Sequence, residues 1–150
     1  MSGSEKRPKP ALSHAEMEDF LRAEFPQVFK ETSGFCIDEI WHGGARVRQA
    51  CRKSFIRPGG TISGPTMMAL ADFAMYVAVF SAIGPQALAV TTNLSINFLR
   101  KPAQADILAD AKLLKVGKRL VVGEVTIFSA GQEDPVAHAT ATYSVPDKAN

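Results

Sequence analysis

The chain has 150 residues, of which 46% are hydrophobic and 21% are charged. A chain of this length and composition is typical of one globular domain with a buried core, and it excludes a disordered, collagenous or low-complexity protein. The formal net charge is only +2, which does not indicate nucleic-acid binding by itself. The two cysteines, Cys36 and Cys51, lack Cys-x-x-Cys spacing, so we expect reduced thiols in a cytoplasmic protein.

The N-terminal segment contains charges, prolines and glycine but no apolar run, so it does not resemble a signal peptide. We expect residues 1–10 to form a disordered arm and residues 11–150 to form the folded domain. Ser13 and Glu16 have the spacing of a capping box, which predicts the start of a short helix. This helix should end before Pro26, which cannot continue it.

Residues 33–55 have the pattern of a β-hairpin. Its turn should be His42-Gly43-Gly44, because glycines favour tight turns, and its return strand should continue to about Phe55. Polar residues alternate along that strand and predict a solvent-facing side; they are Arg46, Arg48 and Arg52.

A loop rich in glycine and proline, residues 57–65, precedes an almost continuously apolar segment that runs from Pro65 to Ala82. Proline is favourable in a first helical turn, and Gly84-Pro85 would end the helix. About 18 apolar residues can also span a membrane. Here Asp72, several alanines and the absence of basic flanks favour a helix that is buried inside a soluble protein.

Four strands are predicted after this helix, at residues 88–100, 104–116, 119–130 and 135–145, the first with a clear period of two. Together with the hairpin they would form an antiparallel sheet of about six strands. Curling that sheet around the apolar helix solves the problem of burying it. The predicted class is therefore α+β, and the arrangement is that of the hotdog fold.

Asp72 is the only charged residue between Arg57 and Arg100. A carboxylate in an apolar helix costs free energy unless it is paired, hydrated or used. Two interpretations stay open at this point: a functional carboxylate, or an aspartate that neighbouring hydroxyls hold or that faces water.

The junction Ser63-Gly64-Pro65 is the second candidate. A helix N-terminus offers free N–H groups, and Pro65 has none, so Gly64 is the natural donor to an oxyanion. A plain glycine cap without a ligand is the alternative. Gly64 and Asp72 are eight residues apart, about 12 Å along one helix. A site that uses both would need two subunits, and hence at least a dimer.

The segment from Gly60 to Pro65, followed by Leu70-Ala71-Asp72, resembles the motif of PaaI-type hotdog acyl-CoA thioesterases. That motif reads roughly G-x-x-H-G-G, then seven residues that end in an acidic one. Residues 93–102, 116–120 and 137–143 resemble the family's strand after the helix, its hairpin turn and its last strand, so the likeness covers about residues 35–145. Two positions depart from the motif: Ser63 replaces its histidine and Pro65 its second glycine.

The resemblance implies an acyl-CoA thioesterase that needs no metal or other cofactor. It implies that Asp72 is the general base or nucleophile, that Gly64 of the partner subunit donates to the oxyanion, and that Thr91 orients the carboxylate or water. It further implies a set of substrate-binding residues, the last four of them candidates for the coenzyme A phosphates: Ser63, Pro65, Met68, Asn93, Arg100, Lys101, Lys118 and Arg119.

The acyl group would lie along the apolar helix and the dimer seam, with Met67, Met68, Phe73 and Met75 as adaptable walls. The expected partners are the acyl-CoA substrate and further copies of the chain, as a dimer or a pair of dimers, with neither nucleic acid nor membrane. The alternative function is a non-catalytic acyl-CoA binding or sensor protein on the same fold, which Ser63 motivates. A dehydratase would usually want a histidine on the helix, and none is there.

Overall fold

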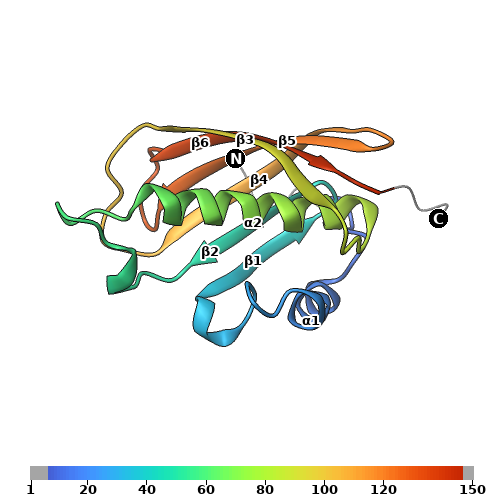
Figure 1. The fold of residues 1–150 in the computed structure, drawn as a ribbon, viewed down its shortest axis with the longest axis horizontal. Coiled ribbons are helices and arrows are strands. Elements are labelled where there is room, and N and C mark those ends of the chain that lie inside the picture. Colours follow the sequence, from blue (N-terminus) through green and yellow to red (C-terminus); the bar gives the residue numbers. More distant parts are fainter. Residues whose placement is uncertain (1–6, 147–150) are drawn as a thin grey trace.

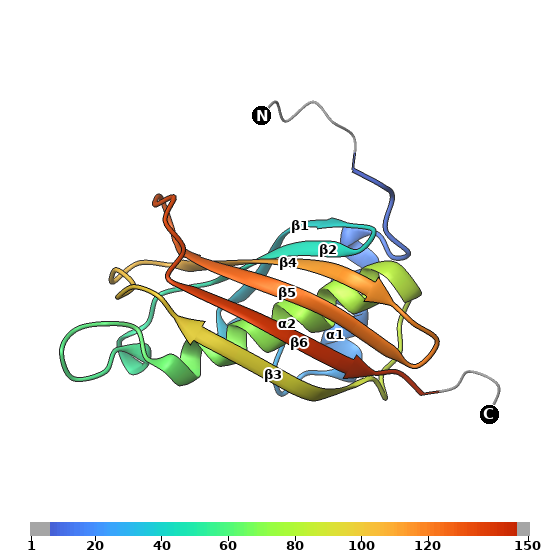
Figure 2. The ribbon, with the colours of Figure 1, turned by 90° about the horizontal axis from the view of Figure 1, so that it is seen from above.

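The computed structural model describes residues 7–146. One long helix, α2 (Gly64–Ile83), lies across a curved sheet, and the short helix α1 (His14–Glu24) packs beside it (Figure 1). The six strands are all antiparallel to their neighbours and β1 and β3 form the two edges (Figure 2). In sheet order they are β1 (Phe35–Trp41), β2 (Gly44–Gln49), β4 (Ile107–Val116), β5 (Leu120–Ser129), β6 (Ala137–Ser144) and β3 (Val90–Phe98). The predicted α+β hotdog fold is confirmed.

Helix α1 begins with the predicted capping box. The Ser13 hydroxyl accepts from the Glu16 N–H at 3.1 Å, and the Glu16 carboxylate accepts from the Ser13 N–H at 2.9 Å. A cap of this kind stabilises a helix by about 1 kcal/mol. Met17 and Leu21 on the inner side of α1 are fully buried, which docks the helix on the rest of the domain.

Residues 1–6 of the expected disordered arm lie outside the described residues. Just after them, Arg7 pairs with Glu39 at 3.0 Å, and its guanidinium lies 3.8 Å from the centre of the Trp41 ring. The Pro8 carbonyl accepts from the His42 N–H. This part of the arm therefore contacts the first hairpin.

The hairpin turns at the predicted glycines, and Gly43 has a φ of +84°. Its return strand ends earlier than predicted, at Gln49 instead of Phe55. The chain leaves the sheet there because the Cys51 N–H donates to the Asp106 carboxylate, and residues Lys53–Phe55 form a 3₁₀ turn.

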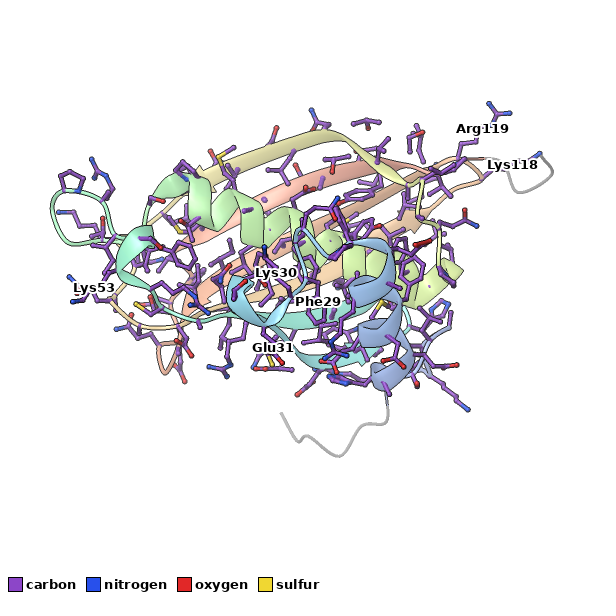
Figure 3. All side chains as sticks on the ribbon, turned by 60° about the horizontal axis from the view of Figure 1, so that its bottom comes forward. Phe29, Lys30, Glu31, Lys53, Lys118 and Arg119 are labelled. Atoms are coloured by element: carbon purple, nitrogen blue, oxygen red, sulfur yellow. The ribbon has the colours of Figure 1, made fainter. Side chains whose placement is uncertain are left out.

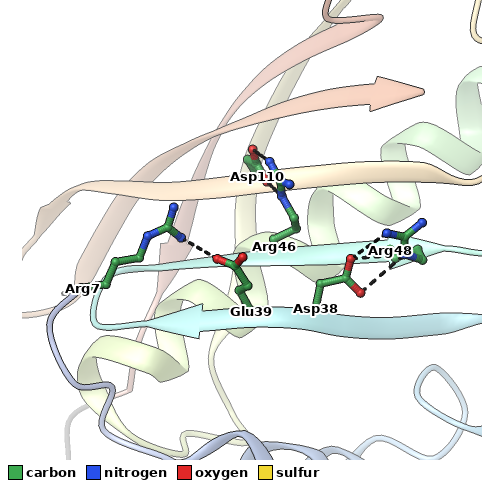
Figure 4. Close-up of polar contacts among 6 residues, drawn as sticks. All are labelled: Arg7, Asp38, Glu39, Arg46, Arg48 and Asp110. Carbon is green, nitrogen blue, oxygen red and sulfur yellow. Dashed lines mark hydrogen bonds and ion pairs between the residues drawn. The ribbon is translucent and has the colours of Figure 1, made fainter. Parts of the chain in front are cut away.

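The arginines of the hairpin are less solvated than the alternation suggested. Arg46 makes two hydrogen bonds to Asp110, at 2.6 and 2.7 Å, and Arg48 pairs with Asp38 at 3.0 Å (Figure 4). Arg52 is exposed, as expected. Charges thus cross-link β1, β2 and β4 on the outer side of the sheet.

Helix α2 is long and apolar enough to cross a membrane, but 67% of its most apolar window is buried inside the protein. The sheet covers one side of α2. Two aromatic residues, Phe20 in α1 and Phe25 just after it, cover part of the other side. The ring centres of Phe20 and Phe80 are 5.2 Å apart, and those of Phe25 and Tyr76 are 4.9 Å apart. The prediction of a buried core helix is confirmed.

Helix α2 packs against β5 at Gly123. A Cβ at that position would lie 2.7 Å from the sulfur of Met75, which is closer than atoms can pack. Met75 is fully buried by this contact. It is part of the core, and the expectation that it forms a wall for the acyl group is wrong.

Candidate active site

Asp72 projects from the middle of α2, where its side chain is half-buried. Two hydroxyls converge on one of its oxygens. Thr91 Oγ1 donates to Asp72 Oδ1 at 2.6 Å, and the Tyr143 hydroxyl donates to the same atom at 2.9 Å. Tyr143 also lies 3.1 Å from the backbone carbonyl of Asp72. The carboxylate therefore has a defined orientation on the helix.

The sheet brings the two hydroxyls together. Thr91 on β3 and Tyr143 on β6 are direct partners in the ladder, and a register shift between Thr91 and Asn93 follows immediately. Thr91 is the expected hydroxyl neighbour of Asp72, so the sequence prediction and the geometry agree on that contact.

Tyr143 is the site residue that the sequence analysis missed. It is only 2% exposed, and burial together with the nearby Asp72 charge raises its pKa well above its usual value. The phenol therefore stays protonated and remains a hydrogen-bond donor. The sequence did contain a signal for its burial. Because side chains alternate between the two faces of a strand, Tyr143 falls on the same side of β6 as three buried alanines, Ala137, Ala139 and Ala141.

These contacts distinguish the two oxygens of Asp72. Oδ1 accepts two hydrogen bonds, whereas no hydrogen bond to Oδ2 exists among residues 7–146. A carboxylate oxygen that keeps its lone pairs free can accept a proton or attack an electrophile.

Asp72 opens into a pocket of about 550 Å³. Five aromatic side chains line it: Phe25, Phe35, Phe73, Tyr76 and Tyr143. The rings of Phe35 and Phe73 stack with their centres 4.5 Å apart. A pocket with aromatic walls and a small number of placed polar groups is the usual form of a small-molecule site. Phe73 is here a pocket wall, as expected.

Gly64 is the first residue of α2, and Ser63 is its N-cap. The Ser63 hydroxyl accepts from the Thr66 N–H at 3.3 Å and lies 2.8 Å from the Thr66 hydroxyl, so it is used in capping the helix. Within the described part of the chain, the Gly64 N–H has no acceptor, and Pro65 has no N–H. Gly64 therefore presents a free donor at the positive end of a helix.

A second groove, of about 480 Å³, runs past Gly64. Met67 and Phe98 line it, and a Cβ on Gly64 would lie 3.3 Å from the Phe98 ring. Three cationic residues also line this groove: Arg57, Arg100 and Lys101. Arg57 was not a sequence candidate. The turn that follows it, in which Gly59 and Gly60 have positive φ, closes back on itself through the hydrogen bond from the Arg57 N–H to the Thr61 carbonyl.

The expected phosphate-binding residues separate into two groups. Arg100 and Lys101 lie beside Gly64, with one Arg100 nitrogen donating to the Pro135 carbonyl at 2.8 Å. Lys118 and Arg119 lie at the other end of the molecule (Figure 3), beside Ile83 at the C-terminal end of α2. The two cationic groups are therefore at opposite ends of the helix.

Two further candidates for substrate binding lie away from both the pocket of Asp72 and the groove of Gly64. Met68 is 41% exposed and Asn93 is exposed on the edge strand, and neither lines the pocket of Asp72 or the groove of Gly64. Pro65 lies at the start of α2, turned towards the side of the helix that faces Phe55.

Comparison with known proteins gives a consistent family. The model of the thioesterase superfamily matches residues 59–136. A candidate thioesterase from Silicibacter sp. TM1040 is 42% identical in its crystal structure; the match has a TM-score of 0.82 and covers 92% of this chain and 94% of that one. The phenylacetic acid degradation protein PaaI from Thermus thermophilus is 26% identical, with a TM-score of 0.68, over 77% of this chain and 96% of that one.

A candidate esterase of Saccharolobus solfataricus is 26% identical over 141 residues, which are 94% of this chain and 91% of that protein. The segment matched by the family begins in the loop before α2 and continues to the start of β6. It therefore includes the helix N-terminus, the carboxylate and its threonine partner. The chain belongs to the thioesterase superfamily, as a PaaI-type hotdog thioester hydrolase.

Proposed function

We propose that this thioester hydrolase converts acyl-CoA thioesters to a free acid and coenzyme A, with Asp72 as the reacting carboxylate. One observation carries the proposal: the single charged residue of α2 is oriented by two hydroxyl donors in a pocket with aromatic walls. A thioester carbonyl that lies above Oδ2 would have its acyl group directed into that pocket.

In the proposed reaction, Asp72 Oδ2 removes a proton from a water molecule while the water oxygen bonds to the thioester carbon. The carbonyl electron pair moves to oxygen and forms an oxyanion. When the carbonyl re-forms, the carbon–sulfur bond breaks, and the leaving sulfur takes the proton that Asp72 holds. Direct attack by Oδ2, followed by hydrolysis of the anhydride, is the nucleophilic form of the same assignment. Thr91 and Tyr143 act as positioning residues because they hold Oδ1.

The proposed oxyanion donor is the Gly64 N–H of a second subunit. Eight residues of α2 separate Gly64 from Asp72, about 12 Å along one helix, too far for both to contact one carbonyl group. Two antiparallel copies of α2 related by a two-fold axis would bring one protomer's Gly64 to its partner's Asp72 and create two equal sites. The Gly64 N–H, which has no acceptor among residues 7–146, supports this role.

The coenzyme A phosphates are proposed to bind along the Gly64 groove. Arg57, Arg100 and Lys101 supply positive charge there, and cations of this kind position phosphate groups. Lys118 and Arg119 are a second cationic group at the other end of α2. Neither assignment requires a metal or another cofactor.

The test is thiol release from short, medium, long and aromatic acyl-CoAs by wild type and Asp72→Asn. We expect wild-type turnover and a fall in kcat of about 10²-fold or more in the variant, the scale of a lost acid–base group. Unchanged turnover in Asp72→Asn would refute the role of Asp72. Tight binding of acyl-CoA by wild type without any release of thiol would instead indicate a sensor.

A further inference from the structure

A second apolar pocket adjoins the pocket of Asp72 on the side of α2 that faces residues 24–35. It has a volume of about 420 Å³, and its far end is formed by Phe55 and Pro65. The two pockets have four lining residues in common, Gln27, Val28, Phe35 and Ala69. They are therefore neighbours along the helix, and we name the two together the α2 groove. It runs from Tyr76 and Asp72, over Ala69, to Pro65.

The walls of the α2 groove come from segments far apart in sequence. Phe29 stacks on Phe73 of α2 with ring centres 5.7 Å apart, which holds the segment after α1 against the helix. Figure 3 labels Phe29, Lys30 and Glu31 on this segment. Val28 on this segment and Ala69 on α2 border both pockets, so they face the junction from opposite sides.

The far end of the groove offers apolar contact and few free polar groups. The Gln49 side-chain amide donates to the Ser33 carbonyl at 2.8 Å, and the Ser33 hydroxyl donates to the Lys30 carbonyl at 2.7 Å. The Thr66 hydroxyl is paired with Ser63. Polar groups that are already satisfied add little to ligand binding, so the surface suits an apolar occupant.

Charge assigns the two halves of an acyl-CoA to different grooves. The charged side chains among the described residues that line the α2 groove are Glu24 and Asp72, and both are acidic. The groove at Gly64 contains three cationic residues instead. A polyanionic nucleotide is disfavoured beside two carboxylates, whereas an uncharged hydrocarbon chain is not.

We propose that the α2 groove receives the acyl chain and that Ala69 sets how long a chain the enzyme accepts. This inference rests on the proposed function, because it places the thioester carbonyl at Asp72. From Asp72 to Pro65 the helix rises about 10 Å, which an extended chain of about nine bonds spans. The preferred substrate class is therefore medium-chain acyl thioesters. We assign this role to Ala69 because it borders both pockets, so that a larger side chain there would block the passage between them.

The test compares kcat/KM for acyl-CoAs of increasing chain length in wild type, Ala69→Leu and Ala15→Leu. Ala69 is exposed on α2 in the single chain, and leucine is a good helix former. We expect Ala69→Leu to lose at least about 10-fold in kcat/KM for medium chains, the minimum for excluding chain atoms from a pocket. The loss should increase with chain length and be smallest for acetyl-CoA, which has the shortest acyl chain. Ala15→Leu makes the same change at an exposed position of α1 and should keep the wild-type profile.

Three other outcomes of this test have different meanings. An equal loss for every chain length would overturn the inference, because the groove would then hold a part common to all acyl-CoAs. If Ala69→Leu does not fold, Val28→Phe narrows the same junction from the opposite wall and must give the same shift to short chains. If wild type releases no thiol from any acyl-CoA, the proposed function fails, and not the position of the groove.

Discussion

The two grooves beside α2 differ in both charge and hydrogen bonding. The α2 groove has aromatic walls and two carboxylates, one of which is held by two donors. The groove at Gly64 has three cationic residues and a backbone N–H without an acceptor in the described chain. The carboxylate of Asp72 and the N–H of Gly64 belong to the helix itself, whereas the three cationic residues come from the segments that border it. The comparison teaches that the fold separates a groove with aromatic walls and acidic residues from a cationic groove. The proposed substrate needs such a separation, because it joins an apolar acyl chain to a nucleotide that carries several negative charges.

The largest loss of kcat is expected from substitutions of Gly64, which test the cationic groove of this comparison. Gly64→Pro removes the N–H, and proline is compatible with a first helical turn; Ser63 before it already has an extended ψ of 153°, as a residue before proline prefers. Loss of an oxyanion donor should lower kcat about 10²- to 10³-fold. Gly64→Ala keeps the donor and only crowds Phe98, so it should lose far less. Equal losses in steady-state assays of both variants would point to crowding alone.

The next effect concerns the Asp72 side. In Tyr143→Phe one donor to Oδ1 is lost, and hydrogen bonds to a charged group contribute about 1.5–3 kcal/mol, so kcat should fall about 10-fold or more. Thr91→Val removes the other donor to Oδ1 and should lower kcat by a similar factor in the same steady-state assay.

Tyr76→Phe is the matched control for that pair. Tyr76 lines the same pocket but makes no hydrogen bond to Asp72 in the described chain. Its variant is free to change KM, but it should leave kcat close to the wild-type value. A loss of kcat in Tyr76→Phe as large as that in Tyr143→Phe would mean that any change in the pocket lowers kcat, and Tyr143 would lose its assigned role.

A smaller effect is expected from the cationic residues beside Gly64. Arg57→Ala and Lys101→Ala should each raise KM for acyl-CoA by up to about 5-fold with little change in kcat, because an exposed ion pair contributes up to about 1 kcal/mol. The effect should shrink as salt is added. A short-thiol thioester without the nucleotide should not respond. If both substrates lose equally, these cationic residues do not bind the nucleotide.

The smallest effect is expected on stability at alkaline pH. The pKa of Tyr143 is raised in the folded protein above its ordinary value of 10.0. Its contribution to the free energy of unfolding is therefore complete below pH 10 and is lost as the pH rises above that value. Urea unfolding of wild type and Tyr143→Phe on both sides of pH 10 should show a shallower alkaline decline in the variant. Parallel declines would assign the alkaline loss to other groups.

Elements whose ends depend on nearby residues were predictable from the sequence. The capping box of Ser13 and Glu16, the turn at Gly43 and the end of α2 before Gly84-Pro85 are all local chemistry. The end of β2 was not predictable, because it depends on a hydrogen bond from Cys51 to Asp106, 55 residues away. The ion pairs of Arg46 and Arg48 were not predictable for the same reason, because their carboxylate partners lie on other strands.

For the site, the sequence by itself determined Asp72 as the charge of an apolar helix and Gly64 as the donor at its start, because residue type and spacing along one helix suffice for both. Only the tertiary structure decided that Thr91 and Tyr143 share one oxygen of that carboxylate, that Met75 belongs to the core, and that Arg57 joins the cationic groove. Those relations depend on sheet register and on the packing of distant segments, which no local pattern records.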